Sequence, residues 1–426
     1  MKSIQLPYGR DKIELRLPAG RKWQILEPKP FDPGIPADQI LNHALKHPIG
    51  SPGLSEMTRP AKRILIITND HTRPMPSMLT IPAITSHFSV PEGNDHITLL
   101  IATGLHRPMT QQEMHERFGS EICGKYRLVN HIATDKANLV SFGKMSTGNE
   151  LFLNKLVAES DLVIAEGFIE SHFFAGFSGG RKSVLPGVAG EATILANHKP
   201  ENIASCGARQ ACLTGNPIHD ECTEAARMSG LQFILNVALD KNKRIIGAFA
   251  GDPITAHLEG CRFVEETMSV DAERTDIVIT SNNGYPLDRN LYQVVKGIDT
   301  ASRVAKANGV IIMAARCTDH VGHDHFKDLI LSCGTVGALY DKMSMSPSQA
   351  DKWQVQVLAR VLARNRVILV SEGIERELAE RMFFTHAKTI GEAVEIAFSM
   401  AGRGASVSVM PEGPVIIPRM VPPTES

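Results

Sequence analysis

The chain has 426 residues, which is enough for two or three domains of ordinary size. Its 45 lysines and arginines balance its 46 aspartates and glutamates, which disfavours a nucleic-acid binder because such proteins usually carry a basic excess. No apolar run reaches the roughly 20 residues of a membrane helix. The N-terminus is charged where a secretion signal has an apolar stretch, so we expect no such signal. The seven cysteines form no CxxC pair, which indicates reduced thiols in the cytoplasm.

Along the chain, short apolar runs predict strands, and helical patterns lie between them. Such runs are typical of strands buried on both faces of a parallel sheet. The predicted strands are Arg63–Thr68, Ile97–Ala102, Leu162–Ala165, Phe233–Leu239, Ile277–Thr280, Val310–Ala314, Val367–Val370 and Ala405–Met410. A capping box at Thr110–Glu113 predicts one helix start, and further helices are predicted at Asn290–Lys306, Trp353–Arg364 and Ile390–Met400. This alternation predicts a doubly wound α/β fold.

The polar segment Met268–Thr275 follows a helical pattern and is the expected boundary between two domains. We therefore predict an N-terminal domain over residues 1–268 and a C-terminal domain over residues 276–401. The tail, residues 405–426, begins with a strand pattern and is expected to return to the first domain.

Candidate functional residues directly follow several predicted strands. In open α/β sheets, ligands bind beyond the carboxyl ends of the strands. At these ends the sequence has polar and glycine-rich segments, namely Asn69–Pro74, Thr103–Pro108, Glu166–Ser183 and Ser281–Pro286. Because the carboxyl ends of parallel strands meet at one edge of a sheet, these segments predict one shared cleft.

The segment Gly176–Ser183 is the richest of these. Its glycines, Gly179 and Gly180 among them, let the backbone approach a ligand and expose N–H donors to an anion. The segment resembles a phosphate-binding P-loop, but Arg181 stands where the second glycine belongs, so a phosphate-handling transferase is the weaker alternative. Lys182 precedes an apolar stretch, where desolvation would lower its pKa and make its amine a covalent attachment point; a solvated loop lysine is the alternative.

Three histidines are candidates for catalysis or metal binding. His106 and His172 lie close to predicted strand ends, where two imidazoles facing one cleft could exchange protons with a substrate from both sides. His198 follows a short helical pattern and could be a single metal ligand. No HExxH motif or Cys/His cluster completes a metal site, so the other ligands would have to come from a cofactor.

Two cations and a second histidine cluster add to the candidate cleft. Arg73 follows the first predicted strand and Lys296 lies on a predicted helix, so together they could hold a small carboxylate, although each could also be a surface charge. A non-catalytic carboxylate-binding protein would use the same two residues. His320, His323 and His325 are expected to form a polar wall or a solvated loop rather than a metal site.

Together these motifs resemble the nickel-pincer lactate racemase family. In the first half of the chain the resemblance rests on Asp70–Pro74 (DHTRP), Ala102–Pro108 (ATGLHRP), Glu170–Gly187 (ESHFFAGFSGGRKSVLPG) and Asn197–His198. In the second half it rests on Leu291–Gly297 (LYQVVKG) and Asp351–Gln354 (DKWQ). It covers most of the chain in the same order, and it implies two Rossmann-like doubly wound domains with the active site in the cleft between them.

The resemblance also implies a cofactor and a set of roles. The cofactor is a lysine-tethered nickel-pincer nucleotide, pyridinium-3-thioamide-5-thiocarboxylic acid mononucleotide, and the reaction inverts C2 of a 2-hydroxy acid by proton-coupled hydride transfer. By resemblance, Lys182 is the tether, His198 is the nickel ligand, and His106 and His172 are the acid/base pair. Further cofactor contacts are expected from Asp70, Gly179, Gly180, Ser183 and Tyr292, and substrate contacts from Arg73, Gln293, Lys296 and Trp353.

The partners implied are a small 2-hydroxy acid and the enzymes that build the cofactor. The sequence does not choose the acid. Lactate is one candidate, and a longer polar substrate, such as a dicarboxylic or sugar-derived hydroxy acid, is the other, because the histidine-rich loop at His320–His325 could contact it. The oligomeric state stays open, a homodimer being one option.

Overall fold

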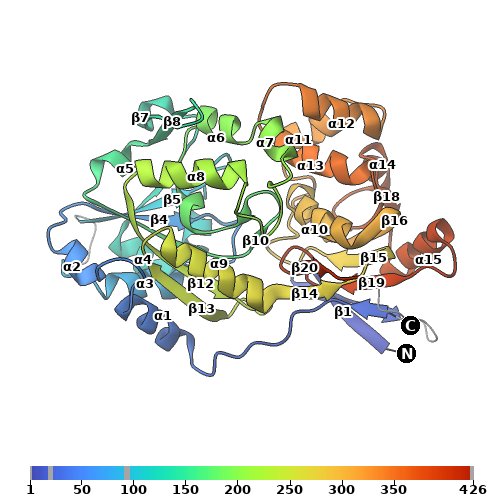
Figure 1. Ribbon diagram of the computed structural model, residues 1–426, viewed down its shortest axis with the longest axis horizontal. Helices are drawn as coiled ribbons and strands as arrows, with labels where there is room; N and C mark the ends of the chain where they lie inside the picture. The colour runs from blue at the N-terminus through green and yellow to red at the C-terminus, as the bar shows by residue number, and fades with distance from the viewer. Residues whose placement is uncertain (1, 18–22, 91–95, 423–426) are drawn as a thin grey trace.

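The computed structural model describes residues 2–17, 23–90 and 96–422 (Figure 1). Two six-stranded sheets organise this part of the chain, one in each half of the view in Figure 1. The predicted α/β class is therefore confirmed. Within the described residues, every helix is too short or too polar to cross a membrane.

The first sheet is parallel except at one edge. In order across the sheet it consists of β13 (Ile245–Gly251), β12 (Leu231–Leu239), β9 (Leu162–Phe168), β4 (Ile64–Asn69), β5 (Ile97–Ala102) and β6 (Arg127–Asn130). Only β13 pairs antiparallel with its neighbour. The strands are continuously apolar because helices cover both faces. On one face lie α1 (Ala37–Lys46), α3 (Ser77–Thr85) and α4 (Gln111–Lys125), and on the other α5 (Lys155–Glu159), α6 (Glu191–Asn197), α8 (Pro217–Met228) and α9 (Thr255–Met268).

The second sheet is parallel throughout. In order it consists of β18 (Thr385–Ala387), β17 (Arg366–Val370), β16 (Ala305–Ala314), β15 (Thr275–Ser281), β19 (Val407–Met410) and β3 (Trp23–Ile25). On one face lie α10 (Leu291–Val304) and α13 (Lys352–Leu362). On the other lie α15 (Ile390–Ala401) and the hairpin of β1 (Lys2–Tyr8) and β2 (Asp11–Leu17).

Shorter elements connect and extend these layers. The remaining helices are α2 (Leu54–Thr58), α7 (Pro200–Ala204), α11 (Asp324–Leu331), α12 (Val336–Met345) and α14 (Arg376–Arg381), with the 3-10 turns η1 (Lys136–Asn138) and η2 (Gly180–Ser183). The remaining strands form the pairs β7 (Leu139–Lys144) with β8 (Glu150–Asn154), β10 (Ser171–His172) with β11 (Gly176–Phe177), and β14 (Ser269–Ala272) with β20 (Ile417–Met420).

All predicted strands are present, with ends shifted by a few residues. The capping box at the start of α4 is confirmed, since the Thr110 side chain accepts a hydrogen bond from the backbone N–H of Glu113. This helix runs to Lys125, across a kink at Gly119. Local apolar and capping patterns therefore located the main elements correctly.

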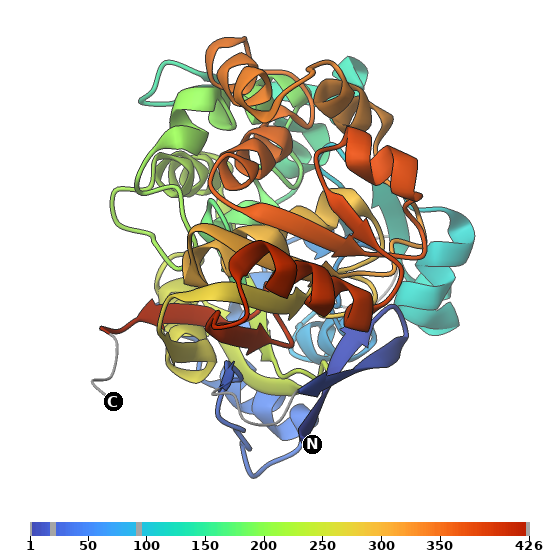
Figure 2. The same cartoon turned by 90° about the vertical axis from the view of Figure 1, so that its right-hand side faces the viewer.

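The two ends of the chain differ from the predicted domain assignment (Figure 2). Residues 2–25 were expected in the N-terminal domain, but β1, β2 and β3 pack on the second sheet. The tail was expected to return to the first domain, but its strand β19 is fully buried between β15 and β3 in the second sheet. Only the following segment turns back, where β20 pairs with β14 and Ile417 packs against Ile169 and Phe177. A strand pattern shows that a strand is buried but does not identify its neighbours.

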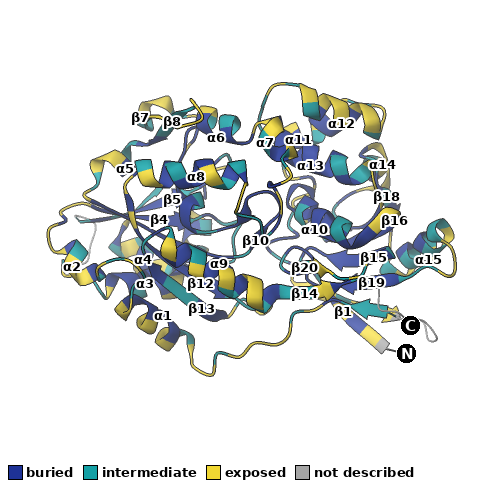
Figure 3. Cartoon of the chain, viewed as in Figure 1, coloured by how far each residue is buried: buried dark blue, intermediate teal, exposed yellow. Residues whose placement is uncertain are grey.

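The core is continuous between the two halves. One cluster of buried apolar side chains includes Leu65 and Ile67 of β4 together with Val278 of β15 and Leu358 of α13. Figure 3 shows buried residues in both sheets and in the segments between them, with exposed residues on outer helices such as α1 and α12. Apolar packing therefore continues from one half to the other.

Candidate active site

One cavity collects nearly all of the predicted site residues. It is lined by Asp70, Arg73 and His106 after β4 and β5, by His172, Gly179, Lys182, Ser183 and His198 after β9, and by Tyr292, Gln293, Lys296 and Trp353 from α10 and α13. The predicted Gly180 is not among the lining residues, because it packs on the ring of His257, which a Cβ at this position would approach to 2.7 Å. The cavity therefore lies between the two halves, at the carboxyl ends of the first sheet's strands.

His106 and Asp70 form a close pair on loops that follow adjacent strands. His106 Nδ1 lies 2.6 Å from Asp70 Oδ2, and the backbone N–H and hydroxyl of Thr72 donate to Asp70 Oδ1 at 3.0 and 2.6 Å. Burial acts to raise the pKa of Asp70, but His106, Arg73 and Thr72 outweigh it and hold this pKa well below its usual range. A carboxylate only accepts hydrogen bonds, so Nδ1 carries a hydrogen and Nε2 is the ring atom left to face a substrate.

His172 lies on β10 and is buried beside the lysine that follows it in the loop. The backbone N–H groups of Phe174 and Ala175 donate to its Nδ1 at 3.5 and 3.2 Å, so the hydrogen of the neutral ring is on Nε2. Lys182 Nζ lies 3.4 Å from Nε2. Burial, followed by the charge of Lys182, lowers the pKa of His172 well below its usual range. The ring is therefore neutral while this lysine is a free amine.

Arg181 supports the glycine loop from inside the protein. Its side chain is almost fully buried, Nη2 donates to the carbonyl of Ala175 at 2.8 Å, and Nη1 lies 3.0 Å from His257 Nε2. Gly179 has a φ of +75°, and a Cβ there would lie 2.6 Å from Asn236 Oδ1. The loop therefore packs on its own arginine, which disfavours the phosphate-binding P-loop alternative.

Lys182 is the reactive candidate of this loop. Its amine lies against His172 and 5.4 Å from the centre of the Phe174 ring. Burial lowers the pKa of Lys182 to about 7. Near neutral pH a large share of this amine is uncharged, which is the form that makes a covalent bond to an electrophile.

His198 ends α6 and faces the cavity among aromatic rings. Its ring centre lies 5.1 Å from that of Phe174 and 4.9 Å from that of Trp353. Its Nδ1 is buried and has no hydrogen-bond partner among the described residues. Burial lowers the pKa of His198 to about 3, so the imidazole is neutral and can donate a lone pair to a metal.

The protein alone does not build a complete metal site. Within the described ranges, no group of three or more His, Cys, Asp or Glu side chains is placed to hold a metal ion. His198 offers one ligand, and the others must come from a bound group. The neutral amine of Lys182 in the same cavity fits a group that is both tethered and metal-bearing.

Helix α10 presents two unsatisfied polar groups to the cavity. Gln293 and Lys296 lie three residues apart, on neighbouring positions of one helix face. In the part of the chain that the structure describes, Gln293 Oε1 and Lys296 Nζ are buried without a hydrogen-bond partner. Burial, followed by the charge of Arg73, lowers the pKa of Lys296 to about 7. Buried polar atoms without partners are costly, so a ligand is expected to satisfy them.

One contact at the cavity was not predicted. His323 Nδ1 lies 3.1 Å from both carboxylate oxygens of Asp351, and the His323 ring stacks on Tyr292 with centres 4.1 Å apart. The two partners are 28 residues apart on different loops, so no local motif could reveal the pair. The neighbouring His320 does not line this cavity, and its Nδ1 lies 2.9 Å from the carbonyl of Gly373.

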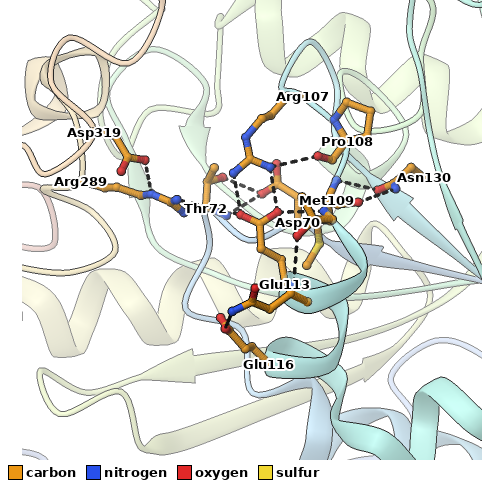
Figure 4. Close-up of polar contacts among 12 residues, drawn as sticks. Asp70, Thr72, Arg107, Pro108, Met109, Glu113, Glu116, Asn130, Arg289 and Asp319 are labelled. Atoms are coloured by element: carbon orange, nitrogen blue, oxygen red, sulfur yellow. Dashed lines mark hydrogen bonds and ion pairs between the residues drawn. The ribbon is translucent and has the colours of Figure 1, made fainter.

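Ion pairs link the two halves beside the cavity (Figure 4). Arg107 donates to Glu113 at 2.7 Å, and Arg289 from the second half lies 4.0 Å from the same carboxylate. Arg289 also pairs with Asp319. Arg107 and Glu113 belong to the first half and Arg289 and Asp319 to the second, so Glu113 bridges the two sides of the cleft.

Comparison with known proteins identifies two matching family models. The model described as the lactate racemase N-terminal domain matches residues 8–210, and the lactate racemase C-terminal domain matches residues 270–417. The lactate racemase of Thermoanaerobacterium thermosaccharolyticum is 42% identical over 98% of this chain and 100% of its own length. That of Lactiplantibacillus plantarum is 40% identical over 97% of this chain and 99% of its own.

Solved structures agree. The lactate racemase apoprotein from T. thermosaccharolyticum superposes with a TM-score of 0.93 at 42% identity, covering 98% of this chain and 100% of that one. A protein from Thermotoga maritima has a TM-score of 0.65 at 16% identity, over 93% of this chain and 100% of that one, which shows a likeness of fold alone. The resemblance predicted from the sequence is confirmed.

Proposed function

The chain belongs to the lactate racemase family, a family of isomerases, and we propose that it inverts C2 of a 2-hydroxy acid with a nickel-pincer nucleotide tethered to Lys182. The observation that carries this proposal is the single cavity shared by Lys182, His198, His106 and His172. Lactate, the acid in the name of both relatives, is the first substrate to test.

The cofactor would be held by groups in the protonation states that it needs. Lys182 would hold it covalently through its neutral amine, and His198 would ligate nickel through a neutral imidazole. The backbone at Gly179 and the Ser183 side chain line the same cavity and would contact the nucleotide. When bound, the group supplies reversible hydride acceptance at C2, which avoids deprotonation of a very weak C–H acid.

The substrate carboxylate is bound by cations from both halves. Arg73 comes from the loop after β4 and Lys296 from α10, and Gln293 lies on the same face of that helix. A carboxylate between them satisfies Lys296 Nζ, which otherwise lacks a partner among the described residues. Trp353 closes the cavity beside His198 and helps to exclude water.

Two imidazoles serve the two faces of the reacting carbon. His106 accepts the hydroxyl proton at Nε2, since Asp70 fixes its hydrogen on Nδ1. After inversion the hydroxyl points to the opposite face, where His172 would exchange the proton through Nε2, which requires Phe174 and Ala175 to release Nδ1 so that it can carry the ring hydrogen. Converting Lys182 into an amide-type nitrogen removes a positive charge 3.4 Å from His172 and raises its pKa toward the working range.

We assign Asp70 a positioning role through His106, and Tyr292 a role in holding His323, although both were expected as cofactor contacts. We further infer Rossmann-like doubly wound domains with the active site in the cleft between them. A cytoplasmic location agrees with seven cysteines that are all free. The enzymes that build the nucleotide are the required partners, and the homodimer stays a prediction.

The test uses protein expressed together with the cofactor-building enzymes. Chiral chromatography follows conversion of each lactate enantiomer by the wild type, His106→Ala, His172→Ala and His115→Ala, the last an exposed histidine on α4 as control. We expect His106→Ala and His172→Ala each to lose about 10²–10⁴-fold in rate and the control to match the wild type. Full turnover in both cavity variants would exclude the two-imidazole mechanism, whereas binding without turnover by the wild type would indicate a carboxylate-binding protein.

A further inference from the structure

We propose that His323 and the second cavity behind it select a hydroxyl on the third carbon of the substrate, so that the chain prefers 2,3-dihydroxy acids to lactate. This inference rests on the proposed 2-hydroxy acid chemistry and specifies its substrate class.

The second cavity adjoins the reacting site across a shared wall of side chains. It has a volume of about 330 Å³, and it shares His106, Gln293, His323 and Asp351 with the first cavity. His106 is the proposed base, so the shared wall lies beside the reacting carbon. A substituent on that carbon can therefore extend into the second cavity, which is far larger than the methyl group of lactate requires.

His323 is held in one orientation at this junction. Its Nδ1 lies 3.1 Å from both oxygens of Asp351, and its ring stacks on Tyr292 at an interplanar angle of 15°. The centre of the ring lies 6.2 Å from that of His106. Asp351 accepts a hydrogen bond from Nδ1, which leaves Nε2 as the ring atom that a substrate hydroxyl, acting as donor or acceptor, can bind.

The rest of the wall favours a hydroxyl over a second carboxylate or an apolar group. Both arginines of the second cavity already have acidic partners, since Arg107 pairs with Glu113 and Arg289 pairs with Asp319. The only large apolar contribution among the lining residues in the described ranges comes from Leu105 and Pro286. A neutral group that both donates and accepts hydrogen bonds is therefore the best match to this surface.

The experiment compares substrates on the cofactor-loaded enzyme. We would measure kcat/KM for enantiopure glycerate, lactate and malate with the wild type, His323→Ala, His323→Gln and the control His320→Ala. We expect the wild type to favour glycerate over lactate by about tenfold, because a site built to bind a hydroxyl discriminates against its absence. His323→Ala should lower that ratio about tenfold, His323→Gln should restore part of it, and His320→Ala should leave it unchanged.

The outcomes separate this inference from the proposed function. A glycerate-to-lactate ratio that is the same in His323→Ala and the wild type, with lactate still racemised, would overturn the inference and leave the racemase proposal standing. Malate preferred over glycerate would also overturn it, in favour of a dicarboxylate. If the loaded wild type inverts none of the three acids, the proposed function fails and this inference fails with it.

Discussion

Replacing Asp70 by asparagine tests how the proposed base is set up. The carboxylate lies 2.6 Å from His106 Nδ1, and an asparagine NH₂ group would donate to that nitrogen instead of accepting from it. The ring hydrogen would then move to Nε2, and the lone pair that faces the substrate would be lost. Loss of the charge-assisted hydrogen bond alone, about 1.5–3 kcal/mol, corresponds to about 10–150-fold in rate. Loss of a positioned base raises the expected effect to about 10²–10⁴-fold.

The assay is the initial rate of racemisation from each enantiomer, measured with Asp70→Asn, Thr72→Val and the wild type. Because the equilibrium constant of a racemisation is one, kcat/KM must fall equally from both enantiomers. Thr72→Val removes one hydrogen bond to Asp70 but keeps its charge, so we expect a loss below about tenfold. Nitrogen NMR of His106 reports the tautomer independently of activity. An Asp70→Asn rate within about threefold of the wild type, with the hydrogen still on Nδ1, would refute the reasoning.

Three further predictions follow from the electrostatics of the site. In Lys182→Met, the pKa of His172 should rise in an NMR titration, because the substitution removes a positive charge that lies 3.4 Å from Nε2; an unchanged pKa would contradict this. In His198→Ala, nickel per chain by elemental analysis should fall close to zero while the mass of the tethered group stays; retained nickel would exclude His198 as the ligand. Arg107 holds the pKa of Glu113 at about 2, so the ion pair stabilises the fold above the ordinary pKa of a glutamate and this stabilisation is lost as the pH falls through about 2. Glu113→Gln should therefore unfold at a lower temperature than the wild type at pH 7, and the difference should fade in acid. A difference in unfolding temperature that does not depend on pH would argue against the ion pair.

Much of the fold could be predicted because its signals are local. Continuous apolar runs such as Leu162–Ala165 identify strands that helices cover on both faces, and the capping box at Thr110 identifies a helix start. Sheet membership at the chain ends could not be predicted. The short strands Trp23–Ile25 and Val407–Met410 pair with each other across almost the whole sequence, and no local pattern encodes that partnership.

The candidate site could be predicted where adjacent parallel strands bring its loops together. The loops of Asp70 and His106 follow adjacent parallel strands, so their side chains meet as expected. The contact of buried Arg181 with His257 and the pairing of His323 with Asp351 depend on packing between distant segments. Such contacts are properties of the folded chain, and spacing in the sequence does not reveal them.

The most direct test of the account is mass spectrometry of active protein expressed with the cofactor-building enzymes. Intact mass and peptide mapping should place one covalent group of the mass of the nickel-pincer nucleotide on Lys182, and Lys182→Ala should have neither the group nor racemase activity. Racemisation by protein whose Lys182 carries no modification would contradict the account.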